Sequence, residues 1–225
     1  IQGGDKHNAI PREAFATILV SPESAADAQI IVSKRSDALS KEFGSMETNL
    51  QVNLSGLDDS PDKTLTRDSQ TNIISLLRTL PHGVLKYSHD VEGLVETSNN
   101  LASVKMGGAG ITVHCSTRSS IAEALEAQRE RIKIMAKDYG AAVEQHEPDP
   151  GWATDVNSPI LETTTRIYTE ILGKDPHICA IHAGLECGVI GEKVEGMDMV
   201  SFGPTIKGPH SPDERVEIES VDKFW

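Results

Sequence analysis

Apolar positions recur at two spacings along this chain, and the spacings predict its helices and strands. Helical spacing of three to four residues predicts helices over residues 22–43, 65–80, 121–139 and 158–172, with a short helix or turn over 184–191. Alternating or short continuous apolar runs predict strands over residues 17–20, 50–54, 94–106, 111–118, 141–145, 177–181 and 197–202. Four small residues, Gly107–Gly110, separate two of these strands and predict a hairpin turn.

The order of these elements predicts an α/β fold in two parts. Each half of the first part ends in the order β-α-β, which indicates a duplicated small α/β layer. A proline-rich acidic connector, His146–Trp152, predicts a domain boundary, so we expect one domain over 1–147 and another over 148–225. The second part follows a β-α order typical of a mixed or parallel sheet, in which ligands bind at the strand ends.

Composition and charge exclude several classes of function. The net charge of −13 argues against nucleic acid as a partner, because phosphate binding needs a basic surface. No apolar run approaches the 18 residues of a membrane span, and three cysteines are too few for a disulfide scaffold. We therefore expect an acidic, soluble, cytoplasmic protein. The chain begins at Ile1 and ends in what looks like an unfinished helix, which predicts a fragment of a longer polypeptide.

A stiff loop offers one candidate metal ligand. Two Gly-Pro pairs and a Ser-Pro pair lie within residues 203–214, and His210 stands among them with Asp213 and Glu214 close behind. A rigid loop fixes an imidazole before a metal arrives, and nearby carboxylates orient its second nitrogen. From spacing alone, a solvated histidine on a surface loop is the favoured interpretation.

Three further positions offer binding chemistry, each beside a plainer structural role. Gly184 leaves backbone N–H groups open to a ligand, or it serves a tight turn. Arg118, at a strand end, presents a planar fork to a carboxylate, or it forms an ordinary salt bridge. Asn8 donates its amide to a polarised carbonyl, or it closes an Asx turn.

Four long motifs together resemble the bacterial aminoacyl-histidine dipeptidases, a group of the dinuclear-zinc M20 metallopeptidases that also include carnosinases. The motifs are NAIPREAFAT from Asn8, HAGLECG from His182, MDMVSFGP from Met197, and GPHSPDE from Gly208 with VEIESV from Val216. They occur in the family's order, and the resemblance extends along essentially all 225 residues.

The resemblance implies roles for four residues. His210 matches the family's last zinc ligand, and Arg118 matches the arginine that holds the C-terminal carboxylate of the dipeptide. Asn8 matches a lid asparagine near the scissile carbonyl, and Gly184 matches a glycine whose backbone positions the substrate. Residues 1–147 then correspond to part of a lid and dimerisation domain, and 148–225 to the C-terminal part of the catalytic domain.

The function implied is metal-dependent hydrolysis of dipeptides, typically Xaa-His including carnosine, by water activated on two zinc ions or other divalent metals. The partners implied are the dipeptide and a second copy of the chain, with neither nucleic acid nor membrane. No catalytic acid or base falls within this chain, and most metal ligands lie outside it, so we predict that the fragment alone is inactive. The alternative is a non-catalytic dimerisation or peptide-carboxylate-binding module.

Overall fold

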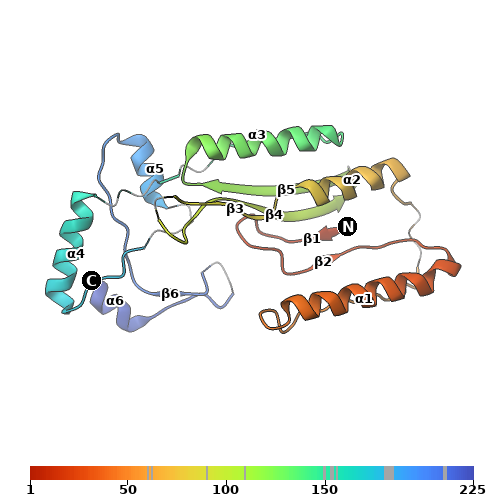
Figure 1. Ribbon diagram of the computed structural model, residues 1–225, viewed down its shortest axis with the longest axis horizontal. Helices are drawn as coiled ribbons and strands as arrows, with labels where there is room; N and C mark the ends of the chain where they lie inside the picture. Colours follow the sequence, from red (N-terminus) through yellow and green to blue (C-terminus); the bar gives the residue numbers. More distant parts are fainter. Residues whose placement is uncertain are drawn as a thin grey trace. The chain divides into compact units, whose positions relative to one another are not determined.

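A computed structural model of the chain combines helices with an antiparallel sheet (Figure 1), which confirms the predicted α/β class. The structure describes residues 1–59, 61, 63–89, 91–108, 110–148, 151–152, 155, 157–179, 185–209 and 212–225. The chain forms two compact units: one joins Ile1–Ala14 to Thr71–Trp225, and the other is Phe15–Gln70. The predicted boundary at 147/148 remains a prediction from the sequence.

A long antiparallel hairpin forms the centre of the first unit. Strand β4 (Val95–Gly107) pairs with β5 (Gly110–Ser119) from Thr97 opposite Ser119 to Gly107 opposite Gly110. Gly110 has a φ of +138°, a conformation that side-chain-bearing residues rarely adopt, so glycine at this end of the turn has a steric reason. Both strands and the hairpin were predicted from alternation and the glycine cluster, and the structure confirms them.

The opposite edge of β4 is shared by two shorter strands. Strand β3 (Gly83–Tyr87) pairs with the first part of β4, and β1 (Gln2–Gly3) pairs at Val104 and is followed outward by β2 (Ala14–Phe15). Between them, a bulge places Ala102 as an extra, fully buried residue. Gly4 lies against this bulge: a Cβ there would come within 2.0 Å of the Ala102 carbonyl oxygen, so no larger residue fits.

One side of the sheet is covered by helices. Helix α3 (Ala122–Asp138) contacts β5, and α2 (Arg67–Thr79) precedes β3 along the chain. Both helices were predicted within a few residues. The buried apolar side chains among the described residues are Leu76, Leu80, Ala102, Val104 and Leu125. The core is therefore small and lies between these helices and the hairpin.

Asn99 is a buried polar link in this core. Its side chain is 1% exposed, donates to the Pro81 carbonyl oxygen at 2.7 Å and accepts from Thr117 Oγ1 at 2.7 Å. Buried amides are tolerated only when their hydrogen bonds are made, so this one joins the start of β3 to both strands of the hairpin.

The second unit consists mainly of one helix. A short 3-10 turn (Pro22–Ser24) leads into α1 (Ala25–Phe43), as the pattern over 22–43 predicted. The strands predicted over 17–20 and 50–54 are wrong, because neither segment joins a described ladder. The prediction of a duplicated β-α-β layer fails with them. Alternation indicates an extended segment but cannot supply the partner strand that a ladder needs.

The C-terminal part begins with a well-capped helix. Helix α4 (Pro159–Leu172) matches its prediction: the Ser158 hydroxyl accepts from the backbone N–H of Leu161, and Gly173 ends the helix at a φ of +66°. The Asp198 carboxylate accepts hydrogen bonds from the Ser158 hydroxyl and from the Ile160 N–H. These bonds lower the pKa of Asp198, the Ser158 bond contributing most.

The rest of this part is less regular than predicted. Helix α5 (Glu186–Lys193) confirms the short helix, and a hairpin of β6 (Ile206–Lys207) and β7 (Arg215–Val216) precedes helix α6 (Ile218–Phe224). The strands predicted over 141–145 and 197–202 are not formed, and residues 177–179 are not in a strand either. The two strands described in this part, β6 and β7, pair antiparallel, so the expectation of a parallel or mixed sheet is wrong for its described residues.

We expect Asn99→Ala to lower the free energy of unfolding of the full-length protein by about 2–4 kcal/mol, because two buried partners lose their hydrogen bonds. Urea denaturation followed by circular dichroism measures the change. Thr112→Ala, at an exposed site on the same hairpin, should stay within about 0.5 kcal/mol. Equal effects of the two substitutions would contradict the role of Asn99.

We expect Asp198→Asn to lower the thermal unfolding midpoint at pH 7, because the asparagine lacks the charge that strengthens both hydrogen bonds. The folded-state pKa of Asp198 is lowered, so its stabilisation is present above the usual aspartate pKa of about 4 and is lost as the pH falls through the folded value. Midpoints measured from pH 7 down to pH 3 should therefore converge. Glu195→Gln, an exposed charge removal, is the control.

Candidate functional site

The two faces of the hairpin differ in chemistry. Side chains alternate between faces along a strand, so Thr97, Asn99 and their partners on β5 lie on the face opposite to Arg118 and its partner Ser98. The face that carries Arg118 is polar throughout the hairpin. Its residues are Ser98, Asn100, Ser103 and Lys105 from β4 and Thr112, His114, Ser116 and Arg118 from β5. We refer to these eight residues as the polar face.

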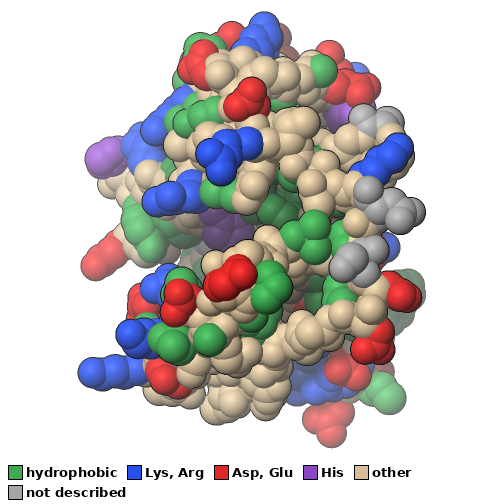
Figure 2. All heavy atoms as spheres, turned by 90° about the vertical axis from the view of Figure 1, so that its right-hand side faces the viewer, with side chains coloured by type: hydrophobic (Ala, Val, Ile, Leu, Met, Phe, Trp, Pro, Cys, Tyr) green, Lys and Arg blue, Asp and Glu red, His purple; other side chains and the backbone are tan. Residues whose placement is uncertain are grey.

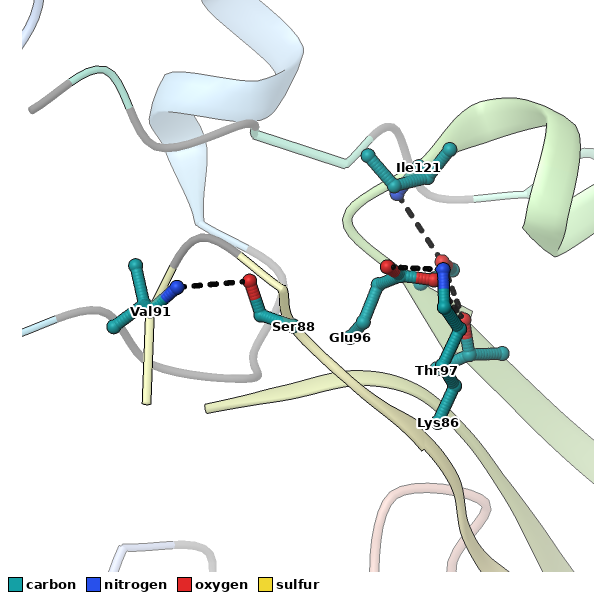
Figure 3. Close-up of polar contacts among 7 residues, drawn as sticks. Lys86, Ser88, Val91, Glu96, Thr97 and Ile121 are labelled. Atoms are coloured by element: carbon teal, nitrogen blue, oxygen red, sulfur yellow. Dashed lines mark hydrogen bonds and ion pairs between the residues drawn. The ribbon is translucent and has the colours of Figure 1, made fainter. Parts of the chain in front are cut away.

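The strand end beneath Arg118 is held by hydrogen bonds on both sides of it. Ser119 Oγ lies 2.9 Å from Thr97 Oγ1 and accepts from the Ile121 N–H at 3.1 Å (Figure 3). The Ser120 N–H donates to the Glu96 carbonyl oxygen. Glu96 is itself buried and accepts a 2.7 Å ion-pair hydrogen bond from Lys86, which lowers the pKa of the Glu96 carboxyl. The backbone that carries Arg118 is therefore fixed before any ligand arrives.

The guanidinium of Arg118 is available to a ligand. The residue is half-buried, yet within the described part of the chain its side chain forms no hydrogen bond and no ion pair. The ordinary salt bridge that the sequence offered as an alternative is therefore not formed there. Five donors in a fixed planar fork, held on a polar face of an acidic protein, are suited to bind a carboxylate through two parallel hydrogen bonds.

Asn8 lies in a turn that is docked on the polar face. The Ala9 N–H donates to the Lys6 carbonyl oxygen at 3.4 Å, and the Asn8 side chain makes no hydrogen bond to any described residue. The Asx turn that the sequence offered as an alternative is thus not seen. The turn is held instead by Asn100, whose Nδ2 donates to the carbonyl oxygens of His7 at 3.1 Å and Ala9 at 2.8 Å.

The structure thus brings two of the four predicted site residues to one face. Arg118 belongs to the polar face, and the turn of Asn8 is bound to Asn100 on the same face. The rings of His7 and His114 also stack there, with centroids 6.3 Å apart. Asn100 and His114 were not predicted as site residues, although the alternation of polar residues on either side of the hairpin turn was a signal for them.

The other two predicted site residues, Gly184 and His210, lie outside the described residues, as does His182. The hairpin of β6 and β7 flanks the loop to which His210 belongs, and a 2.9 Å ion pair between Lys207 and Glu217 joins its base. Over the described part of the chain, no three His, Cys, Asp or Glu side chains gather as metal ligands. Burial raises the pKa of the Cys115 thiol and so disfavours its nucleophilic form.

The chain matches two known dipeptidases over its whole length. It is 39% identical over 223 residues to the cytosol non-specific dipeptidase of Escherichia coli K12, a match that covers 99% of this chain and 46% of that protein. The crystal structure of aminoacylhistidine dipeptidase from Vibrio alginolyticus superposes with a TM-score of 0.83 at 37% identity, over 100% of this chain and 46% of that one. The chain therefore spans about half the length of both relatives. No family model matches it.

These two comparisons confirm the resemblance that the four sequence motifs predicted, because the identity is high, the fold agrees and both matches cover the chain from end to end. In sequence and in fold, this chain resembles the aminoacyl-histidine dipeptidases along its whole length.

Proposed function

We propose that the full-length protein is a metal-dependent dipeptidase that hydrolyses dipeptides of the Xaa-His type, β-alanyl-histidine among them. The observation that carries this proposal is the guanidinium of Arg118, half-buried on the polar face and without a partner among the described residues. The similarity to two dipeptidases supports the same reaction class.

Arg118 would bind the free C-terminal carboxylate of the dipeptide. Two parallel N–H···O bonds from a planar fork fix both the position and the orientation of that carboxylate. A peptide extended beyond its second residue presents an amide at this point in place of a charge, and it leaves the guanidinium partly unpaired. The clamp therefore selects for length, and dipeptides are the class that it favours.

Asn8 would act at the scissile carbonyl. A side-chain amide without another hydrogen bond is free to donate to the carbonyl oxygen, on which negative charge grows as water attacks. Its backbone is already held by Asn100, so little reorganisation is needed when the substrate binds. Gly184 would add backbone N–H groups to the same positioning task.

A pair of zinc ions, or other divalent metals, would supply a water molecule activated near neutral pH. We propose His210 as one metal ligand from this chain, and we assign the remaining ligands and the general base to polypeptide outside these 225 residues. The tasks of the described residues are accordingly to bind and orient the substrate.

The proposed enzyme is a cytosolic homodimer. The E. coli relative is named as a cytosol protein, and no described helix of this chain is both long and apolar enough to cross a membrane. Large apolar side chains are exposed on the second unit and on the C-terminal helices, among them Ile31, Ile171 and Ile218, and Figure 2 shows hydrophobic side chains among charged ones on one face. We propose that a second copy and further polypeptide cover such side chains.

A carboxylate-binding module without catalytic activity is the second candidate. It is favoured by one observation: the two described site residues, Arg118 and Asn8, both have binding chemistry, and neither is an acid, base or nucleophile. Hydrolysis by the full-length protein decides between the two candidates.

We expect Arg118→Ala in the full-length protein to lower kcat/KM for β-alanyl-histidine about 100-fold, mainly through KM, because two charge-assisted hydrogen bonds are lost. Steady-state assays of histidine release measure this change. The same substitution should have little effect on a dipeptide amide, which already lacks the carboxylate. If the acid and the amide lose activity equally, the clamp is ruled out.

We expect the isolated 225-residue chain to show no metal-dependent hydrolysis of β-alanyl-histidine, because the resemblance gives it one metal ligand and no general base. The assay uses the chain with added zinc, and the full-length protein is the positive control. Measurable turnover that depends on zinc would show that the proposed division of ligands is wrong.

A further inference from the structure

We propose that Asn100 is a positioning residue for Asn8, and that it sets where the Asn8 amide stands relative to Arg118. The inference rests on the proposed function and deepens it, since none of the four residues assigned by the resemblance is Asn100. It follows from the contacts of Asn100 with the turn and from its place on β4.

The contacts of Asn100 bracket Asn8. Its Nδ2 donates both of its hydrogens, to the carbonyl oxygen of His7 at 3.1 Å and to that of Ala9 at 2.8 Å, the residues on either side of Asn8. The His7 carbonyl belongs to the peptide unit before Asn8, and the unit after Asn8 is held through the Ala9 N–H, which donates to the Lys6 carbonyl oxygen at 3.4 Å. Holding these units restrains the direction of the Cα–Cβ bond of Asn8, and so the region that its side chain reaches. Stacking of His7 on His114 restrains the same turn.

The place of Asn100 on β4 links the turn to the carboxylate clamp. Asn100 pairs with Ser116, and Ser98, two residues earlier on the same face, pairs with Arg118. Asn100 and Arg118 are therefore diagonal neighbours, whose Cβ atoms lie about 7–8 Å apart in a regular antiparallel pair. Both strands are held in a continuous ladder, so the spacing between clamp and turn is set by the sheet and not by a flexible loop.

The remaining polar atom of Asn100 has no structural task among the described residues. Its Oδ1 is buried and lacks a hydrogen-bond partner there, a state that costs stability. The backbone at this point is served by a different side chain, because His82 Nδ1 accepts from the Leu101 N–H at 3.0 Å. Among the described residues, the hydrogen bonds that the Asn100 side chain forms are therefore the two that it donates to the turn of Asn8.

The test measures kcat and KM of the full-length protein for β-alanyl-histidine in the single variants Asn100→Ala, Asn100→Ser and Asn8→Ala and in the double variant Asn8→Ala/Asn100→Ala. A displaced donor weakens stabilisation of the growing charge but leaves the carboxylate clamp in place. We therefore expect Asn100→Ala to lower kcat about 10- to 100-fold with KM changed less than about threefold. Because Asn100 acts through Asn8, the double variant should be no slower than Asn8→Ala by more than about twofold.

Gln145→Ala is the matched control. Gln145 also donates a side-chain amide to a backbone carbonyl, that of Arg129 at 3.2 Å, but this acceptor belongs to helix α3 and not to the Asn8 turn. It should leave kcat and KM within about twofold of the parent protein. Thermal unfolding of each variant gives the folded fraction for which kcat is corrected, and Asn100→Ser, which keeps a short polar side chain, replaces Asn100→Ala if the latter does not fold.

The inference is overturned if Asn8→Ala lowers kcat while both Asn100 variants retain it, or if the Asn8 and Asn100 effects multiply. Those results leave the proposed function intact. If the parent protein hydrolyses no dipeptide in the presence of zinc, the proposed function fails, and the positioning role fails with it.

Discussion

The antiparallel ladder between β4 and β5 is the constraint on which the rest of the first unit depends. It runs from Thr97 and Ser119 at one end to the glycine turn at the other, and both edges of β4 are in use. On each side of the bulge at Ala102, alternation divides the ladder's side chains into two sets with separate tasks. One set carries the buried link of Asn99 and packs toward the helices, and the other carries the polar residues of the candidate site.

A gap on the other edge of β4, the edge away from β5, lies beside the candidate site. Between β3 and β1 the outer edge of β4 has no strand beside it, and a strand edge left open exposes backbone groups that need partners. Side chains take the place of a strand: His82 serves the Leu101 N–H, and Asn100 binds the turn that returns from β1. A gap in pairing thereby gives a loop residue, Asn8, a defined position on an otherwise regular face.

Elements that are defined by their own residues, such as a capped helix or a tight hairpin, were predicted closely. Strands that need a partner from elsewhere in the chain were not. Ser158 and Gly173 define both ends of α4 by their own chemistry, and Gly107–Gly110 defines the hairpin, so these elements were predicted closely. The segments 17–20, 50–54, 141–145 and 197–202 have extended patterns but no partner strand in the described structure. Pairing depends on residues distant in sequence, which no local pattern reports.

For the candidate site too, part could be predicted from the sequence and part is seen only in the structure. Spacing alone left Arg118 and Asn8 with plain structural roles, and only the family resemblance gave them tasks. The structure adds that neither side chain forms the plainer bond, the salt bridge or the Asx turn, with any described residue. Alternation marks Asn100 as a polar position on the hairpin, but its positioning contacts could not be predicted, because they join it to a turn more than 90 residues away.

A half-buried guanidinium without a partner is costly, and this cost explains how the proposed site would discriminate. Partial burial removes water from Arg118, while no described carboxylate forms an ion pair with it. A ligand carboxylate restores the lost interactions, whereas a neutral amide leaves donors unpaired, so selectivity arises from the penalty for the wrong ligand as much as from attraction to the right one. The strand end that carries Arg118 is held by Thr97, Ser119 and Glu96. The backbone of Arg118 therefore cannot move the guanidinium out into water, and the cost of leaving its donors unpaired remains.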